Sequence, residues 1–342
     1  MKLKKKYIII IITLLILFGI EQFLFYNLSD KEKTKSDHIY GIESYVSTDK
    51  LVVKKEDNPI ILFASDYQGE DRYSNVNYLF NFTSKHVKPN LFVMCGDYRV
   101  SLDNNYTESE NGILELSRIF NKYFGNVPII MLQGNHDLSN TYGLVKKQYF
   151  VTSNYIIYNI NNDDFPNNQD VEKGSEETVK NTASKLNDFL EKQEKTKIKK
   201  PIFIVSHVPL HYTDRNNGGD NKYAKYLFDV INKYSKNLDI VFLFGHNHSG
   251  KYDDYIGGSV NYIAKGENIN VGGTNKKELI NFTYMNAGYI GFSNNTNSAT
   301  STNDLTVSSI KVKKDLLEIQ RYTMDKLYYE NSIIVKRINK NN

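Results

Sequence analysis

The 342-residue chain has one cysteine and very little excess of either charge, and each shortage excludes a class of protein. With Cys95 alone no disulfide can form within the chain, and its apolar neighbours predict that it packs as a small hydrophobic residue. Lys and Arg number 43 against 39 Asp and Glu, and the opening MKLKKK supplies the whole excess of 4. The remainder is formally neutral, so it lacks the basic surface of a nucleic-acid binder.

The chain also lacks internal repeats, which argues against a solenoid. Hydrophobic residues make up 40% of it and aromatic residues 13%, enough for a sizeable buried core. The composition therefore predicts a folded globular protein.

Residues 1–26 combine the lysine cluster with an apolar run that is interrupted at Glu21 and Gln22. No small-residue cleavage site and no lipid-accepting cysteine follow the run, which favours an uncleaved single-pass membrane anchor over a cleaved signal peptide. Lysines beside a membrane span stay in the cytoplasm, so we expect everything after the anchor to be extracytoplasmic. Cleavage would instead give a secreted protein. Residues 27–58 are polar and predict a stalk, and 59–342 predict the functional domain.

From Pro59 onward, short apolar runs alternate with amphipathic segments. Strands are predicted over 59–64, 90–95, 127–132, 200–206 and 238–244, and helices over 75–87, 111–124, 175–195 and 221–235. Strands that are apolar throughout and alternate with helices indicate an α/β protein with helices over the sheets. Further strands are predicted near 261–264 and 279–285 and, in an antiparallel tail, over 305–314, 315–322 and 331–338.

All five of the early apolar runs are followed by residue types that bind metals. These residues are Asp66, Gln68, Asp97, Asn135, His136, Asp137, His207, His246 and His248. Any one of them alone would be read as a turn or loop residue, but five such strand ends are hard to explain as turns. Ligands of open α/β sheets bind at the carboxyl ends of the strands, and a mixture of Asp, Asn and His suits divalent transition metals.

The stretch ASDYQG illustrates the geometry that we expect. In an extended chain, residues two apart point to the same face, which predicts that the side chains of Asp66 and Gln68 lie together. Near the motifs, His211 could line the substrate mouth and Arg99 could reach a phosphate. The simpler interpretations, which we favour, are a solvated loop residue for His211, a surface residue for Arg99 and a turn residue for Asn286.

The motifs D-x-Q, GD, GNHD, H-x-P and GHxH, in this order, resemble those of the calcineurin-like metallophosphoesterase superfamily. They begin here at Asp66, Gly96, Gly134, His207 and Gly245, and the resemblance covers about residues 59–325. It implies a four-layer αββα sandwich of two facing mixed β-sheets flanked by helices. It also implies hydrolysis of phosphate mono- or diesters, by attack of a hydroxide that bridges two divalent metal ions.

The resemblance implies a role for each motif residue. Asp97 would bridge the two ions, and His136 would lie beside the substrate phosphate with its ring oriented by Asp137. The remaining ligands would divide into two sets, Asp66, Gln68 and His248 for one ion and Asn135, His207 and His246 for the other.

Gln68 departs from the histidine that is commoner in the family at this position. A carboxamide oxygen is a weaker ligand than imidazole for late transition metals, so the first ion should bind more weakly or be Mn or Fe. The metal identity stays open among Mn, Fe, Zn, Ni and Co. Val100 stands where purple acid phosphatases carry a tyrosine, which argues against that subgroup.

Two other functions stay open from the sequence: a catalytically weak or inactive metal-binding scaffold at the cell surface, and a nuclease of the same fold. The neutral domain argues against the nuclease. Residues 138–175, 211–222 and 251–304 are expected to shape the substrate pocket but carry no recognisable motif, so neither the phosphate ester nor the oligomeric state is predicted.

Overall fold

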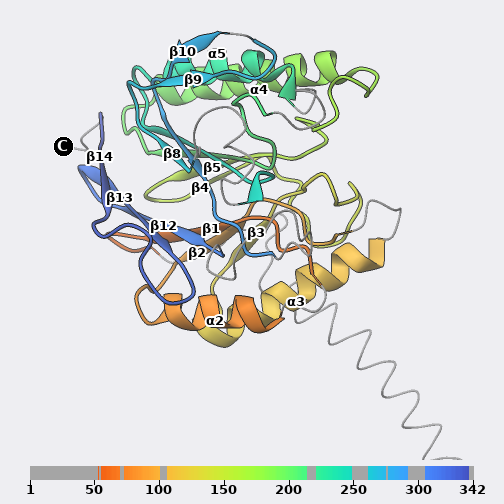
Figure 1. The fold of residues 1–342 in the computed structure, drawn as a ribbon. Helices are drawn as coiled ribbons and strands as arrows, with labels where there is room; N and C mark the ends of the chain where they lie inside the picture. The colour runs from red at the N-terminus through yellow and green to blue at the C-terminus, as the bar shows by residue number, and fades with distance from the viewer. Residues whose placement is uncertain are drawn as a thin grey trace, which may run out of the picture.

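The computed structural model describes residues 53, 55–69, 73–100, 106–213, 221–248, 261–274, 276–291 and 305–338. The predicted membrane anchor and most of the predicted stalk lie outside these ranges. No helix within them has the length and apolar character needed to cross a bilayer. Figure 1 shows the arrangement of the elements.

One six-stranded sheet carries the first three motifs. Its strand order is β14 (Ile333–Lys336), β13 (Leu316–Tyr322), β12 (Val307–Val312), β1 (Ile60–Ala64), β2 (Leu91–Met94) and β3 (Ile129–Met131). Strands β1, β2 and β3 are parallel. On the other side of β1 lie the three strands of the C-terminal tail, each antiparallel to its neighbour. The parallel strands therefore end at the same edge of the sheet.

The second six-stranded sheet carries the two histidine motifs. Its order is β4 (Tyr149–Val151), β5 (Ile156–Ile160), β6 (Ile202–Ser206), β7 (Ile240–Phe244), β11 (Thr283–Asn286) and β8 (Tyr262–Ile263). Strands β5, β6, β7 and β11 are parallel, and β4 and β8 are antiparallel edge strands. A separate two-stranded sheet pairs β9 (Asn268–Asn270) with β10 (Lys277–Leu279).

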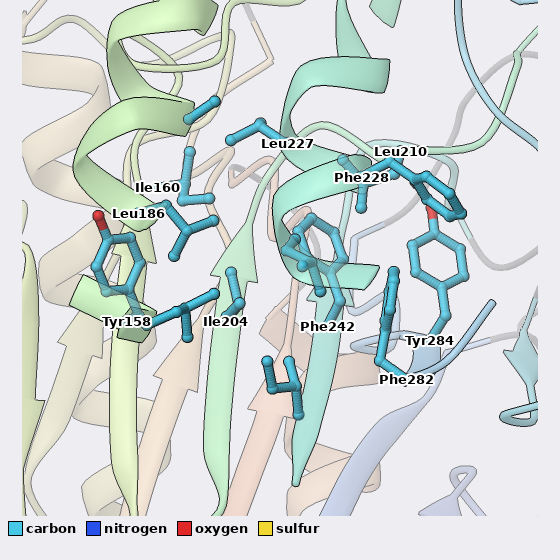
Figure 2. Close-up of a cluster of buried hydrophobic side chains, with 14 of the residues drawn as sticks. Tyr158, Ile160, Leu186, Ile204, Leu210, Leu227, Phe228, Phe242, Phe282 and Tyr284 are labelled. Carbon is cyan, nitrogen blue, oxygen red and sulfur yellow. The ribbon is translucent and has the colours of Figure 1, made fainter. Parts of the chain in front are cut away.

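Helices cover the outer face of each large sheet (Figure 1). Helices α2 (Tyr73–Ser84) and α3 (Tyr106–Phe124) pack on the first sheet, and α4 (Ser175–Glu194) and α5 (Ala224–Tyr234) on the second. Figure 2 shows the apolar cluster beneath α4 and α5. A third cluster joins the inner faces of the two sheets, with the Phe63 and Phe203 rings 5.8 Å apart and Cys95 buried among them.

Every strand and helix predicted for the described ranges is present, which confirms the mixed α/β class. The short strand β9 was not predicted. Strands β4 and β5 were not predicted either, although β5 is an interior strand of the second sheet. They lie within the 138–175 segment that carried no recognisable motif. The polar Asn159 interrupts the apolar run of β5, and its side chain donates a hydrogen bond to the Lys147 carbonyl oxygen (2.8 Å).

The two sheets are joined at the edge where the parallel strands end. Ser65, directly after β1, forms a parallel bridge with Tyr289, which follows β11 of the other sheet, and the Ile290 N–H donates to the Ser65 carbonyl oxygen. The carboxyl ends of both sets of parallel strands therefore meet at one place, and Asp66 is the next residue after the bridge.

Candidate metal centre

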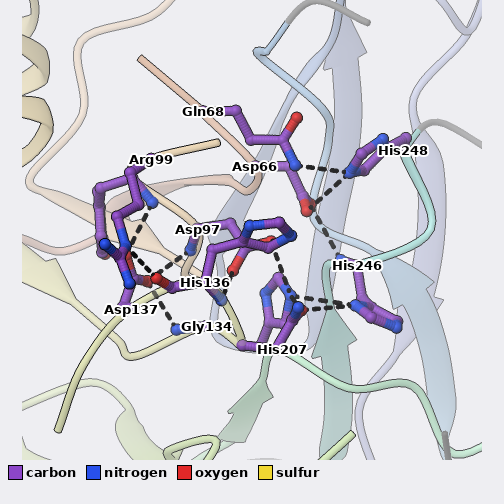
Figure 3. A network of polar contacts seen from close by, with 12 residues as sticks. Asp66, Gln68, Asp97, Arg99, Gly134, His136, Asp137, His207, His246 and His248 are labelled. Carbon is purple, nitrogen blue, oxygen red and sulfur yellow. Dashed lines mark hydrogen bonds and ion pairs between the residues drawn. The ribbon is translucent and has the colours of Figure 1, made fainter. Parts of the chain in front are cut away.

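All nine predicted site residues lie at this meeting point. Figure 3 shows the side chains that follow β1, β2 and β3 facing those that follow β6 and β7. The predicted ligands from one sheet are thus within contact distance of those from the other. Since only the fold brings these loops together, the cluster is a tertiary feature rather than a local one.

Five of the predicted ligands have a left-handed backbone conformation. Among the non-glycine residues that the structure describes, φ is positive at Asp66 (58°), Gln68 (49°), Asp97 (64°), His246 (69°) and His248 (36°). Such conformations cost on the order of 1–3 kcal/mol each and persist where the surroundings enforce them, often at functional sites. All five strained residues are candidate ligands, which indicates that the backbone of these loops is shaped by the need to place the ligand side chains.

The left-handed backbone corrects the expected extended geometry of ASDYQG. Residues Asp66 and Gln68 are not in a strand, and their N–H groups donate to the carbonyl oxygens of Gly96 and Asp97 (3.0 Å each). Their side chains nevertheless converge, because both reach His248. Long-range hydrogen bonds, rather than strand periodicity, place them together.

Three donor atoms from three loops form one group. Asn135 Oδ1 lies 2.8 Å from His207 Nε2 and 2.9 Å from His246 Nδ1, and the two ring nitrogens are 3.3 Å apart. The other ring nitrogen of His207, Nδ1, donates to the Cys95 carbonyl oxygen at 2.7 Å. That hydrogen bond keeps a proton on Nδ1, so Nε2 is the ring nitrogen of His207 that is placed to bind a metal.

A second group contains Asp66, Gln68 and His248. Asp66 Oδ1 lies 3.3 Å from His248 Nε2; it is buried and accepts no hydrogen bond from the part of the chain that the structure describes. The carboxamide of Gln68 is 3.1 Å from the same ring nitrogen through Nε2, and a half-turn of the amide would present Oε1 instead. The His248 ring stacks on Tyr289, with centroids 4.7 Å apart.

Asp97 lies between the two groups. Its Oδ2 is 3.3 Å from His207 Nε2, and its Oδ1 accepts the backbone N–H of His136 (3.0 Å). Single ligand atoms of Asp66, Asp97 and His207 all lie within 4.8 Å of one another. Asp97 is therefore the residue placed to contact both groups.

The donor spacing fits metal coordination. Bonds of about 2.1 Å give distances of roughly 3.0–3.4 Å between adjacent ligand atoms in octahedral or tetrahedral geometry. The observed distances within the two groups and to Asp97 run from 2.8 to 3.3 Å. Together with the unsatisfied oxygen of Asp66, this spacing fits a site for divalent cations.

The charges of the site are strongly coupled. Burial alone would raise the pKa of Asp97, but the nearby His207 and His136 rings lower it well below its usual range. Burial alone would lower the pKa of His207, but Asp97 raises it to about 9. A cation that binds at Nε2 must therefore displace a proton from His207 at neutral pH.

This competition predicts that metal affinity rises with pH. Between about pH 6 and 9 the apparent dissociation constant for Mn²⁺ should fall by about tenfold per unit, because one proton leaves His207 for each ion bound there. In the metal-free protein the sign is opposite. The raised pKa stabilises the fold fully below about 6.5, and this contribution is lost as the pH rises through about 9.

Calorimetric titration with Mn²⁺ at pH 6, 7 and 8 measures the affinity, and buffers of different ionisation enthalpy give the number of protons released. Proton release near zero together with a flat affinity profile would contradict the assignment of His207.

The Asp137 side chain has a different set of contacts from the one that the resemblance implies. Its Oδ2 accepts the backbone N–H groups of Asp97 and Gly134 (2.8 Å each), and its Oδ1 accepts the N–H of Tyr98 and the hydroxyl of Ser109. Among the residues that the structure describes, the buried Nδ1 of the His136 ring has no hydrogen-bond partner, so the expected Asp137–His136 ring contact is not formed. The Asp137 carboxylate instead links the GD loop to the GNHD loop through these hydrogen bonds.

Burial, reinforced by the negative charge of Asp97, raises the pKa of Asp137 to about 6, although the three backbone N–H groups lower it. Nearly the whole hydrogen-bonding capacity of this carboxylate is used in joining the two loops.

Two of the simpler interpretations were wrong. Arg99 is not a surface residue: its side chain is buried, its Nε donates to the His136 carbonyl oxygen, and its Nη1 lies 4.0 Å from Glu108 on α3. His211 is not solvated: it is 4% exposed. Asn286 is the last residue of β11, and its Oδ1 accepts the Gly288 N–H at 2.8 Å just beyond the strand end.

The sequence does contain one signal that His211 is buried. It follows an apolar VPL segment directly after a motif histidine, where a solvated side chain would be out of place.

Comparison with known proteins agrees with this arrangement. The sequence model of the calcineurin-like phosphoesterase family matches residues 60–250. A search of curated protein sequences gave no match. Similar solved structures include a dimetal phosphatase from Danio rerio (9% identity, 82% of this chain and 99% of that chain, TM-score 0.54). GAP50, the anchor in the inner membrane complex of Plasmodium, is also similar (11% identity, 83% and 90%, TM-score 0.51).

At such low identities the solved structures show the fold alone. The family is shown by the sequence model, which matches more than half of the chain. The chain belongs to the calcineurin-like phosphoesterase family.

Proposed function

We propose that the chain is a hydrolase of phosphate mono- or diesters that depends on two divalent metal ions. The proposal rests on two groups of polar side chains on loops with a strained backbone. Neighbouring side-chain atoms within the groups, and between His207 and Asp97, are 2.8–3.3 Å apart, and Asp97 lies between the two groups. One group is Asp66, Gln68 and His248, and the other is Asn135, His207 and His246. When bound, divalent ions supply an activated water and neutralise the charge that develops on the phosphoryl oxygens.

The protein residues have separate tasks in this proposal. Asp97 holds the two groups in register, and the Cys95 carbonyl oxygen fixes the ring of His207. His136 is the candidate catalytic acid: its ring is 17% exposed, and its Nε2 lies 3.8 Å from Asp97 Oδ2. From there it can donate a proton to the leaving oxygen or a hydrogen bond to the phosphate.

Hydrolysis of model substrates tests the proposal. The full-length chain in detergent is stripped with a chelator, loaded with Mn, Fe, Zn, Ni or Co, and assayed with p-nitrophenyl phosphate and bis-p-nitrophenyl phosphate. Turnover that requires added metal supports the enzyme. Binding of metal without turnover of either ester would favour the inactive scaffold, and salt-dependent DNA binding with DNA cleavage would favour the nuclease.

Gln68 is a test of the first donor group. Gln68→Leu should weaken one ion by about 10–100-fold, because a group in contact with His248 is lost. Gln68→His should preserve binding and tighten it most for Zn and Co, because imidazole is the stronger donor to those metals. Metal titration of both variants shows whether Gln68 is a ligand. If Gln68→Leu bound both ions as the parent does, Gln68 would stabilise the loop and would not bind the ion.

We also propose that residues 1–26 anchor the protein in a membrane, with the catalytic domain on the extracytoplasmic side. The support is the lysine cluster followed by an apolar run. The full-length protein should remain in the membrane fraction after a high-salt wash and be digested by protease added outside intact cells. Recovery of a soluble protein that begins near residue 27 would show that the segment is a cleaved signal.

A further inference from the structure

The buried His211 lies in a chain of hydrogen bonds behind the metal centre. Its Nδ1 is 2.6 Å from the Tyr284 hydroxyl and its Nε2 is 3.1 Å from the side-chain amide of Asn247. Asn247 is the residue between His246 and His248, so the chain of contacts ends on the loop that supplies one donor to each group.

Tyr284 provides a fixed end for this chain. It lies on β11, next to β7, and its ring stacks on Phe244 with centroids 4.6 Å apart. Figure 2 shows Tyr284 beside Leu210 at one side of the apolar cluster. The hydroxyl accepts the backbone N–H groups of Leu210 (2.9 Å) and His211 (3.2 Å), so it also fixes the loop that follows His207.

The hydrogen bonds of Tyr284 favour one tautomer of His211. A phenol oxygen accepts two hydrogen bonds and donates one, and the two N–H groups occupy the acceptor positions. With both N–H groups pointing at its oxygen, the hydroxyl is oriented to donate to Nδ1 of His211 at 2.6 Å, which fits the tautomer with its proton on Nε2. Nε2 then donates to the Asn247 carboxamide, which offers its oxygen after a half-turn.

The Asn247 loop needs such support. The residues on either side, His246 and His248, have left-handed backbones, and Asn247 itself is completely buried. Strained conformations persist only where their surroundings hold them. The Gly245 N–H donates to the His207 carbonyl oxygen at 3.0 Å, which is a direct backbone link between the two histidine loops.

We infer that Tyr284, His211 and Asn247 form a positioning relay that sets the His207 loop against the His246–His248 loop, and so fixes how the two ions sit together. The inference rests on the proposed two-metal site. The three residues are positioning residues rather than catalytic ones, since they act on the ions through the three motif histidines. Weakening the relay should loosen metal binding while the fold stays intact.

Mn²⁺ binding to the full-length protein tests the relay. Tyr284→Phe removes one oxygen and keeps the stacked ring, and it should weaken Mn²⁺ binding by about 10–100-fold, as loss of a supporting partner does. The electron paramagnetic resonance signal of two coupled Mn²⁺ ions should weaken at a metal ratio that saturates the parent. His211→Phe should give a similar loss, and the double variant should lose much less than the product of the two, because both changes break one relay.

Tyr158→Phe is a matched control. Tyr158 belongs to the same apolar cluster and the same sheet, and its buried hydroxyl forms no hydrogen bond within the described residues. It should bind Mn²⁺ as the parent does. Parent-like binding by Tyr284→Phe, an equal loss in Tyr158→Phe, or fully multiplicative losses in the double variant would overturn the relay. Because the readout is Mn²⁺ binding, a parent that binds two ions without hydrolysing esters would contradict the proposed activity and leave the relay testable.

Discussion

Asp97→Asn is expected to lose the second of the two metal ions and nearly all hydrolytic activity. The negative charge of Asp97 lies between the donor groups and offsets the mutual repulsion of two cations, and the substitution removes this charge. An amide can retain the hydrogen bond from the His136 N–H, and its NH₂ group can donate to His207 Nε2 at the observed 3.3 Å. The variant should therefore fold, because these two hydrogen bonds can hold the loops of the metal-free site together.

The expected magnitudes are large. Affinity for the second ion should fall by at least about 100-fold, beyond the 10–100-fold typical of lost supporting partners, and kcat/KM by about 10³-fold or more. Metal content by mass spectrometry, together with turnover of an aryl phosphate, measures both. Parent-like content of two ions in Asp97→Asn would show that this carboxylate does not join the groups.

His136→Asn is the comparison that separates metal binding from chemistry. The contact of His136 with Asp97 Oδ1 uses the backbone N–H, which the substitution keeps. Metal content should stay near that of the parent while kcat falls by about 10²–10⁴-fold, the range for loss of a general acid or base. An empty metal site in His136→Asn would assign this ring to the ions instead of the substrate.

The elements that carry the site were predictable because their sequence signal is local. Strands β1, β2, β3, β6 and β7 are short apolar runs, and each is followed at once by a polar motif. Parallel order then follows from the intervening helices, and parallel strands bring their ends to one edge. Strand β5 gave no such signal, because Asn159 breaks its apolar run and no motif follows it.

The backbone and the support of the site were not predictable, because they depend on partners far away in sequence. The left-handed conformation of Asp66 accompanies a hydrogen bond to Gly96, and the burial of His211 depends on Tyr284, 73 residues away. Arg99 resembles a surface residue until its side chain is placed against His136 and α3. The sequence motifs identified the candidate ligands, whereas only the fold identifies the residues that hold these ligands in place.

Gly134 shows how closely the loops of the site approach one another. It begins the GNHD motif, and a Cβ atom built there would lie 2.1 Å from Asp97 Oδ1 and 2.4 Å from the Asp97 backbone nitrogen. Neither atom can yield alone: Oδ1 accepts the N–H of His136, and the Asp97 N–H donates to Asp137. A methyl group at Gly134 must therefore push the GD and GNHD loops apart.

Gly134→Ala should consequently empty the metal site, because the displacement moves Asp97 away from both donor groups. The expected outcome is loss of both ions at metal concentrations that saturate the parent, a drop of about 100-fold or more in kcat/KM, and about 1–3 kcal/mol of destabilisation from overpacking. The control is Gly174→Ala at the start of α4. That position has a positive φ of 88° but nothing within 4 Å of a built Cβ, so the substitution should cost about 1–2 kcal/mol and leave metal content unchanged. Metal analysis and thermal unfolding of both variants decide between steric displacement of Asp97 and a general loss of stability. Equal metal loss in the two variants would favour the general loss, whereas full metal content in Gly134→Ala would show that the loops can separate without moving the bridging carboxylate.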